Sequence, residues 1–169
     1  MLAQPHSTLL CSGVVLDATQ QQERGRRLAQ GLVQLGFRPG DVLAVFLKNC
    51  PQYADVVHAC RLAGVVYCPI NWHFTAAEIQ FLLEDSGAKA LLCSQELLEG
   101  LDPGLHTPIP KLVIDASQAE QDYETWLAAQ PVYKWVDAQG QTHYGSQLPP
   151  QQADASQVKV SPNSSSGAG

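Results

Sequence analysis

The residue types that most often carry out acid–base chemistry are sparse in this sequence and are not grouped. His58 lies in a predicted helix and His73 in a predicted turn. Histidine is the commonest general base, but it needs an orienting partner, and neither residue has a second histidine or a carboxylate at metal-ligand spacing. Glu84 and Asp85 are adjacent, and adjacent residues of a helix point in different directions. We therefore predict no catalytic residue.

A phosphate-binding loop is the second kind of chemistry to consider. Residues 164–169 read Ser-Ser-Ser-Gly-Ala-Gly, and small residues let backbone amides approach a phosphate. No lysine follows them, and their Ser-, Pro- and Gln-rich surroundings are typical of a polar chain end. No pair of the five cysteines has the spacing of a zinc or redox motif, which favours reduced, buried thiols. We predict no cofactor-binding and no metal-binding residue.

Charge and hydropathy exclude several classes of protein. The net charge is −6, with 10 basic against 16 acidic residues, so no basic face is available for nucleic acid or anionic lipid. No apolar run approaches the roughly 20 residues that span a bilayer. The short run at Leu9–Cys11 follows no lysine or arginine, so we expect no secretion signal. These features predict a cytoplasmic protein with no nucleic-acid partner and no transmembrane segment.

Strand patterns recur through the central part of the chain. We predict strands at Val42–Leu47, Val65–Cys68, Lys89–Cys93 and Lys111–Ile114. Val42–Leu47 is uninterrupted and apolar, as in strands that are covered on both faces. Each gap between strands is long enough for a crossover connection. The pattern predicts an α/β fold with a partial doubly wound, mainly parallel sheet and flanking helices.

The first predicted helix runs from Thr19 to a left-handed glycine cap at Gly36. Its apolar positions are Leu28, Leu32 and Leu35, and its water-facing positions are Arg24, Arg26 and Arg27. Gly25 inside this helix costs about 1 kcal/mol relative to alanine.

Three more helices are predicted between and after the strands. One opens with Asn49 as its cap and Pro51 in its first turn, and its apolar positions are Tyr53, Val56, Val57 and Cys60. Another starts at a capping box formed by Thr75 and Glu78. A short helix covers Tyr123–Ala129.

The character of the sequence changes after residue 130. Residues 132–144 read as two short strands around a glycine-containing turn, which predicts a C-terminal β-hairpin. Residues 161–169 have the composition of a disordered tail. We divide the chain into an N-terminal leader segment (1–18), an α/β region (19–130), a hairpin module (131–160) and the disordered tail (161–169).

Three stretches occur in a specific order: Gly36–Asp41 before the first strand, Asn71–Thr75 after the second, and Leu82–Lys89. With them, residues 19–130 resemble the N-terminal subdomain of AMP-forming acyl-CoA ligases, which belong to the adenylate-forming superfamily, and especially fatty acyl-CoA synthetases. The resemblance implies that a fatty acid or other carboxylate attacks ATP to form an acyl-adenylate, from which CoA displaces AMP. It also implies ATP, Mg and CoA as cofactors of the intact family. Asn71 and Trp72 would lie near the family's acyl and CoA path, although we expect them to serve packing here.

The family's phosphate loop, which is rich in Ser, Thr and Gly and ends in Lys, should follow soon after residue 130, but no such loop stands there. The family's downstream acidic ligands and its C-terminal catalytic lysine have no counterpart either. We therefore expect a truncated N-terminal part of an acyl-CoA ligase, inactive alone. Missing partner strands should leave apolar sheet surface exposed, which predicts self-association.

A second resemblance supports an alternative hypothesis. Residues 132–160, with Tyr133, Trp135, Asp137 and His143, are similar to a small domain of unknown function in bacterial envelope proteins. This similarity implies a fusion near residues 129–131. The alternative is a non-enzymatic envelope or interaction protein that uses the hairpin module, and location of the chain in the periplasm would favour it.

Overall fold

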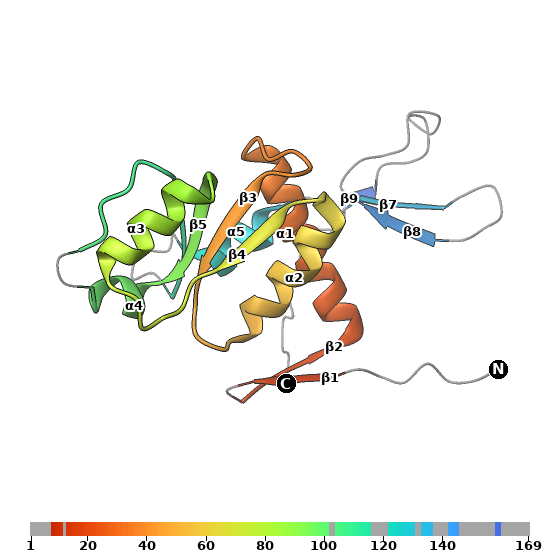
Figure 1. Ribbon diagram of the computed structural model, residues 1–169. Coiled ribbons are helices and arrows are strands. Elements are labelled where there is room, and N and C mark those ends of the chain that lie inside the picture. The colour runs from red at the N-terminus through yellow and green to blue at the C-terminus, as the bar shows by residue number, and fades with distance from the viewer. Residues whose placement is uncertain are drawn as a thin grey trace.

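A four-stranded parallel sheet, in the order β4-β3-β5-β6, forms the centre of the fold (Figure 1). The computed structural model describes residues 8–11, 13–101, 104–115, 122–130, 133–136, 142–145 and 158–159. The strands are β3 (Val42–Phe46), β4 (Val66–Pro69), β5 (Ala88–Ser94) and β6 (Lys111–Ile114). Leu43 pairs with Tyr67 of β4 and with Ala90 of β5, so β3 is internal. The predicted doubly wound α/β fold is confirmed.

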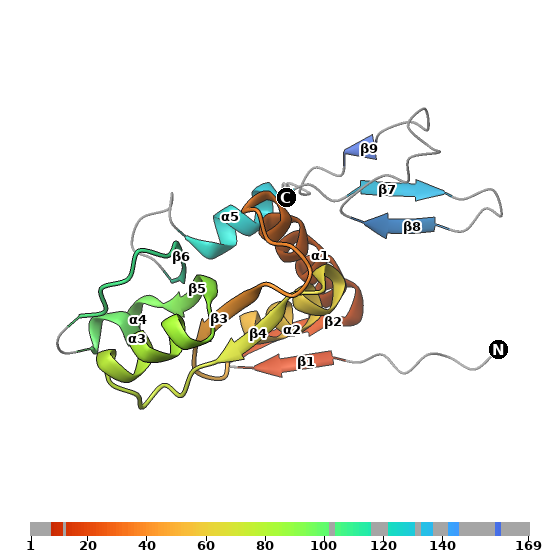
Figure 2. The same ribbon diagram turned by 45° about the horizontal axis from the view of Figure 1, so that its top comes forward.

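Helices cover both faces of the sheet. The helices α1 (Ala18–Gln34), α2 (Pro51–Ala63) and α5 (Tyr123–Ala129) lie on one face, and α3 (Ala76–Asp85) and α4 (Gln95–Glu99) lie on the other (Figure 1). Figure 2 shows α5 beside α1, and the two helices are in contact. Because side chains alternate along a strand, β3, β5 and β6 each contribute to two separate cores.

The two cores explain the apolar runs at Val42–Phe46 of β3 and Ala90–Cys93 of β5. Leu43 and Val45 pack on the α1, α2 and α5 side, and Ala44 and Phe46 pack on the α3 and α4 side. All four of these side chains are 0% exposed. A strand that is buried on both faces has no position for a polar residue, as predicted for Val42–Leu47.

Two antiparallel elements flank the parallel sheet in the sequence. The strands β1 (Thr8–Cys11) and β2 (Val14–Asp17) form a hairpin within the segment predicted only as a leader. The predicted C-terminal hairpin is confirmed by β7 (Tyr133–Val136) and β8 (Thr142–Gly145). A further strand, β9 (Val158–Lys159), pairs with β7. The predicted tail, residues 161–169, lies outside the described residues.

The four predicted helices are present, with differences at two N-termini, and the short helix α4 was not predicted. The backbone N–H of Gln20 donates to Asp17 Oδ1 at 2.8 Å, and the Gln20 side chain accepts a hydrogen bond from the backbone N–H of Asp17. The helix α1 therefore begins at a capping box. The predicted cap at Asn49 is wrong, because Cys50 occupies the cap position of α2 and makes no side-chain cap bond. The predicted capping box at Thr75 and Glu78 is confirmed.

The predicted exposure is wrong for some residues at the edges of the helix faces. Leu35 and Val57 were expected to be buried and are 43% and 44% exposed. Arg24 and Arg27 were expected to face water, and their side chains are only 21% and 8% exposed. The reason is that α1 packs against α5 as well as against the sheet and α2, so its arginine side also becomes an interface.

Within the parallel sheet, the edge strand β4 carries the most exposed apolar side chains. Val66 and Tyr67 of the edge strand β4 are 53% and 38% exposed, whereas β3 and β5 are covered by helices on both faces. Alternation in the β3–β4 ladder directs the backbone of Pro69 toward the open side, where proline offers no N–H donor. Self-association through exposed sheet surface stays a prediction, and this edge is where it would occur.

Within the described residues, no helix has the length and apolar character that crossing a membrane requires.

Candidate functional site

The residues examined for chemistry in the sequence do not come together. His58 packs against Gly25 at the contact between α1 and α2, and burial lowers its pKa. Glu84 accepts a hydrogen bond from the Gln80 side chain on α3. The Ser164–Gly169 stretch lies outside the described residues. Among the residues that the structure describes, no three histidine, cysteine or carboxylate side chains are grouped to hold a metal ion.

A cavity of about 440 Å³ lies where the sheet geometry places a ligand site. The chain passes from β3 to β4 through α2 on one face, and from β4 back to β5 through α3 on the other. In open α/β sheets such a reversal leaves a crevice at the carboxyl ends of the diverging strands, here β3 and β5. Lys48 follows β3, Glu96 follows β5, and both line this cavity together with Trp72. We call it the switch-point crevice.

The polar and aromatic groups of the crevice contact one another. Lys48 Nζ lies 2.7 Å from Glu96 Oε1 and 5.4 Å from the centroid of the Trp72 ring. Trp72 is 45% exposed, and its ring lies against His73 with 3.4 Å between ring centroids. The backbone N–H of His73 donates to Asn71 Oδ1 at 3.1 Å and fixes this turn. A partly exposed tryptophan beside an ammonium group can stack a flat ring and pair with an anion.

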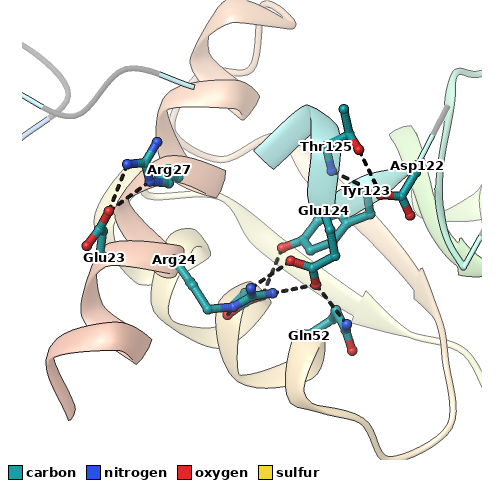
Figure 3. A network of polar contacts seen from close by, with 9 residues as sticks. Glu23, Arg24, Arg27, Gln52, Asp122, Tyr123, Glu124 and Thr125 are labelled. Carbon is teal, nitrogen blue, oxygen red and sulfur yellow. Dashed lines mark hydrogen bonds and ion pairs between the residues drawn. The ribbon is translucent and has the colours of Figure 1, made fainter. Parts of the chain in front are cut away.

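A second polar cluster joins α1, α2 and α5, and we call it the helix clamp (Figure 3). The Arg24 guanidinium donates to both carboxylate oxygens of Asp55, with 2.7 Å between Nη2 and Oδ2. It also donates to both oxygens of Glu124 at 2.7 and 2.8 Å. The Tyr123 hydroxyl donates to Asp55 Oδ2 at 3.0 Å, and Gln52 Nε2 donates to Glu124 at 3.0 Å. The polar groups of the clamp form hydrogen bonds and ion pairs with one another, which indicates a structural role.

Burial and the neighbouring charges shift the pKa values of the clamp's carboxylates in opposite directions. Burial raises the pKa of Asp55, although Arg24 opposes this effect. Burial also raises the pKa of Tyr123 well above its usual value. At Glu124 burial acts the same way, but hydrogen bonds from Arg24 and Gln52 outweigh it and lower the pKa. Glu124 is therefore held ionised, and Arg24 is its main partner.

Replacing Glu124 by glutamine is expected to weaken the acid dependence of folding. Because the pKa of Glu124 is lowered in the folded state, its ionised form adds stability above its unfolded pKa, and that stability is lost as pH falls through the folded value. The free energy of unfolding should therefore fall less between about pH 5 and about pH 3 in Glu124→Gln than in the wild type. Urea unfolding followed by circular dichroism at each pH measures this difference. Asp55, whose raised pKa contributes with the opposite sign, titrates in both proteins. Equal acid dependence would contradict the prediction.

Neither cluster was identified in the sequence. One signal was available for the clamp: Asp55 lies next to Val56 on the buried side of a helix, and a carboxylate there needs a partner. For the crevice, the signal was a charged residue within three residues of the end of each of two predicted parallel strands. Sequence spacing alone does not show that Lys48 contacts Glu96, because this contact depends on the order of the strands in the sheet.

Known proteins share this sequence pattern and this fold. The family described as AMP-binding enzyme matches residues 3–164, a range that includes the hairpin module. The chain is 34% identical over 88 residues to the fatty acid–acyl-carrier-protein ligase ScoC of Streptomyces coeruleorubidus, covering 52% of this chain and 17% of that protein. It is 35% identical over 120 residues to a feruloyl-CoA synthase of Amycolatopsis sp, covering 69% of this chain and 24% of that protein.

A solved structure shows the same fold. A benzoate CoA ligase from Burkholderia xenovorans LB400 superimposes with a TM-score of 0.62 at 23% identity, covering 70% of this chain and 24% of that one. The chain thus spans about a quarter or less of the length of these relatives. The resemblance of residues 132–160 to an envelope domain stays a prediction. The family match extends over most of the sequence, and the chain belongs to the AMP-binding enzyme family.

Proposed function

We propose that this chain forms the N-terminal α/β part of an AMP-forming acyl-CoA ligase and does not form an acyl-adenylate by itself. The family match and the relatives that are named as CoA or carrier-protein ligases support the first half. In the intact enzyme the substrates would be a fatty acid or another carboxylate, ATP with Mg²⁺, and CoA. In the described part of the chain, no disulfide involves Cys50, Cys60, Cys68 or Cys93. Reduced cysteines suit a reducing compartment, and we place the protein in the cytoplasm.

One observation carries the proposed inactivity. In the described part of the chain, the two most buried of the ion-paired cations, Arg24 and Arg27, are each held 2.7 Å from a carboxylate of the same chain. Stabilising the charge that develops at a triphosphate requires donors that are preorganised toward it. Groups that neutralise one another within the fold do not meet this requirement.

We further propose that the switch-point crevice faces the path of CoA in the intact ligase. The crevice lies at the carboxyl ends of β3 and β5, where sheets of this topology bind ligands. It includes Trp72 in the Asn71–Thr75 stretch, which the resemblance to the ligases places near that path. The exposed Trp72 ring offers a stacking surface, and Lys48 offers a positive charge beside it.

Purified protein is expected to catalyse no ATP–pyrophosphate exchange. The assay contains ATP, Mg²⁺ and labelled pyrophosphate with medium-chain and long-chain fatty acids, ferulate or benzoate in turn. An intact benzoate CoA ligase in the same buffer serves as the positive control. Exchange by this chain above the level without protein would overturn the proposed inactivity and leave the family membership unaffected.

A further inference from the structure

One ion pair crosses the switch-point crevice from strand to strand. Lys48 lies two residues beyond β3, and Glu96 lies two residues beyond β5. Their charged atoms are 2.7 Å apart, so the pair joins the two strands whose ends form the crevice. The side chains remain 45% and 68% exposed. An exposed pair of this kind is held weakly and opens readily.

The Lys48 ammonium group also lies close to the aromatic ring of the crevice. Lys48 Nζ lies 5.4 Å from the Trp72 ring centroid while it contacts Glu96. A flat ring that stacks on Trp72 and carries a phosphate would bring its negative charge next to Lys48. In the present structure, the carboxylate of Glu96 pairs with the Lys48 ammonium group instead. Ligand and Glu96 therefore compete for one cation.

We infer that Glu96 is an intramolecular latch that holds Lys48 until the phosphate of a nucleotide-bearing ligand displaces it. The inference rests on the proposed function, in which that ligand is CoA. Displacement breaks the Lys48–Glu96 contact, forms a Lys48–phosphate contact, and frees the exposed Glu96 carboxylate to turn toward water. The latch lowers affinity for the anionic ligand and keeps Lys48 beside Trp72.

The expected effect of the latch is small and has a definite sign. Exposed ion pairs contribute little to stability, so removing the carboxylate should tighten CoA binding about two- to five-fold. Loss of the Lys48 charge should weaken binding about five-fold or more, because hydrogen bonds to charged groups are stronger than neutral ones. Both effects should shrink as salt is added, since the groups are exposed.

The test is titration of CoA into the full chain, followed by nuclear magnetic resonance, for the wild type, Glu96→Gln and Lys48→Gln. The matched control is Lys89→Gln, which removes an ion pair with Asp41, also 2.7 Å long, at the amino end of the strands. Glu96→Gln should bind more tightly, Lys48→Gln more weakly, and Lys89→Gln like the wild type. Pantetheine, which lacks the phosphates, should show no response to Glu96→Gln.

The outcomes separate the latch from the function on which it rests. If the wild type binds CoA and Glu96→Gln binds it equally or more weakly, the latch is overturned and the placement of the CoA path stands. If no variant binds CoA, the placement of the path is overturned and the latch with it. The exchange assay bears on neither result, since it reports on ATP.

Discussion

Replacing Arg24 by methionine is expected to lower the free energy of unfolding by about 3–5 kcal/mol, because it leaves a buried carboxylate without its partner. The Asp55 side chain is 1% exposed, and Arg24 donates to both of its oxygens. After the substitution, the Tyr123 hydroxyl is the donor to Asp55 that remains among the described residues. Urea unfolding at neutral pH measures the loss. Domains of this kind have total stabilities of about 5–15 kcal/mol, so the variant would be largely destabilised.

Two further variants keep this prediction testable if Arg24→Met does not fold. Adding Asp55→Asn to Arg24→Met should restore part of the stability, because the amide is uncharged and still accepts a hydrogen bond from Tyr123. Lys89→Met removes an ion pair whose lysine is 48% exposed, and it should cost no more than about 1 kcal/mol. A loss below about 1 kcal/mol for Arg24→Met would contradict the assigned role of the helix clamp.

Gly25→Ala is expected to destabilise the protein by about 1–3 kcal/mol, although alanine is the better helix former. A Cβ atom at this position would lie 2.4 Å from His58 Cδ2 and 2.7 Å from His58 Cβ. Rotating the histidine moves its ring but not its Cβ, so α1 and α2 would have to separate. The size of the loss, measured by urea unfolding, reports how closely the two helices must approach.

Matched glycine and histidine variants test this explanation. Gly100→Ala adds the same methyl group where the nearest atom is 3.5 Å away, so it should be neutral or slightly stabilising. Adding His58→Ala to Gly25→Ala should relieve only part of the strain, because the ring is removed and the Cβ remains. Equal stability of Gly25→Ala and Gly100→Ala, each relative to the wild type, would argue against a backbone constraint.

Sequence periodicity predicted most of the fold because each core strand and helix carries its own pattern. Lys111–Ile114 and Tyr123–Ala129 have the predicted boundaries, and the Thr75–Glu78 capping box forms as expected. These features depend on neighbours within a few residues. The hairpin of β1 and β2 was missed because two strands of four residues each give little periodic signal.

Charged residues were interpreted less well than apolar ones. Arginines at helical spacing opposite an apolar stripe indicate a solvated face, but Arg26 is half-buried and donates to Gln22 on the same helix. Arg27 instead donates to the backbone oxygens of Ala128 and Gln130, about a hundred residues away along the chain. Whether a charge faces water or another helix depends on a partner that the local pattern does not contain.

By itself the sequence determined the alternation of strands and helices and the family. Those properties follow from local spacing and from the order of motifs along the chain. Only the tertiary structure decided that β3 lies between β4 and β5, that Lys48 meets Glu96 beside Trp72, and that Arg24 joins three helices. The physical reason is that contact energies depend on distance in space, and strand order and helix packing bring together residues whose separation in the sequence carries no such information.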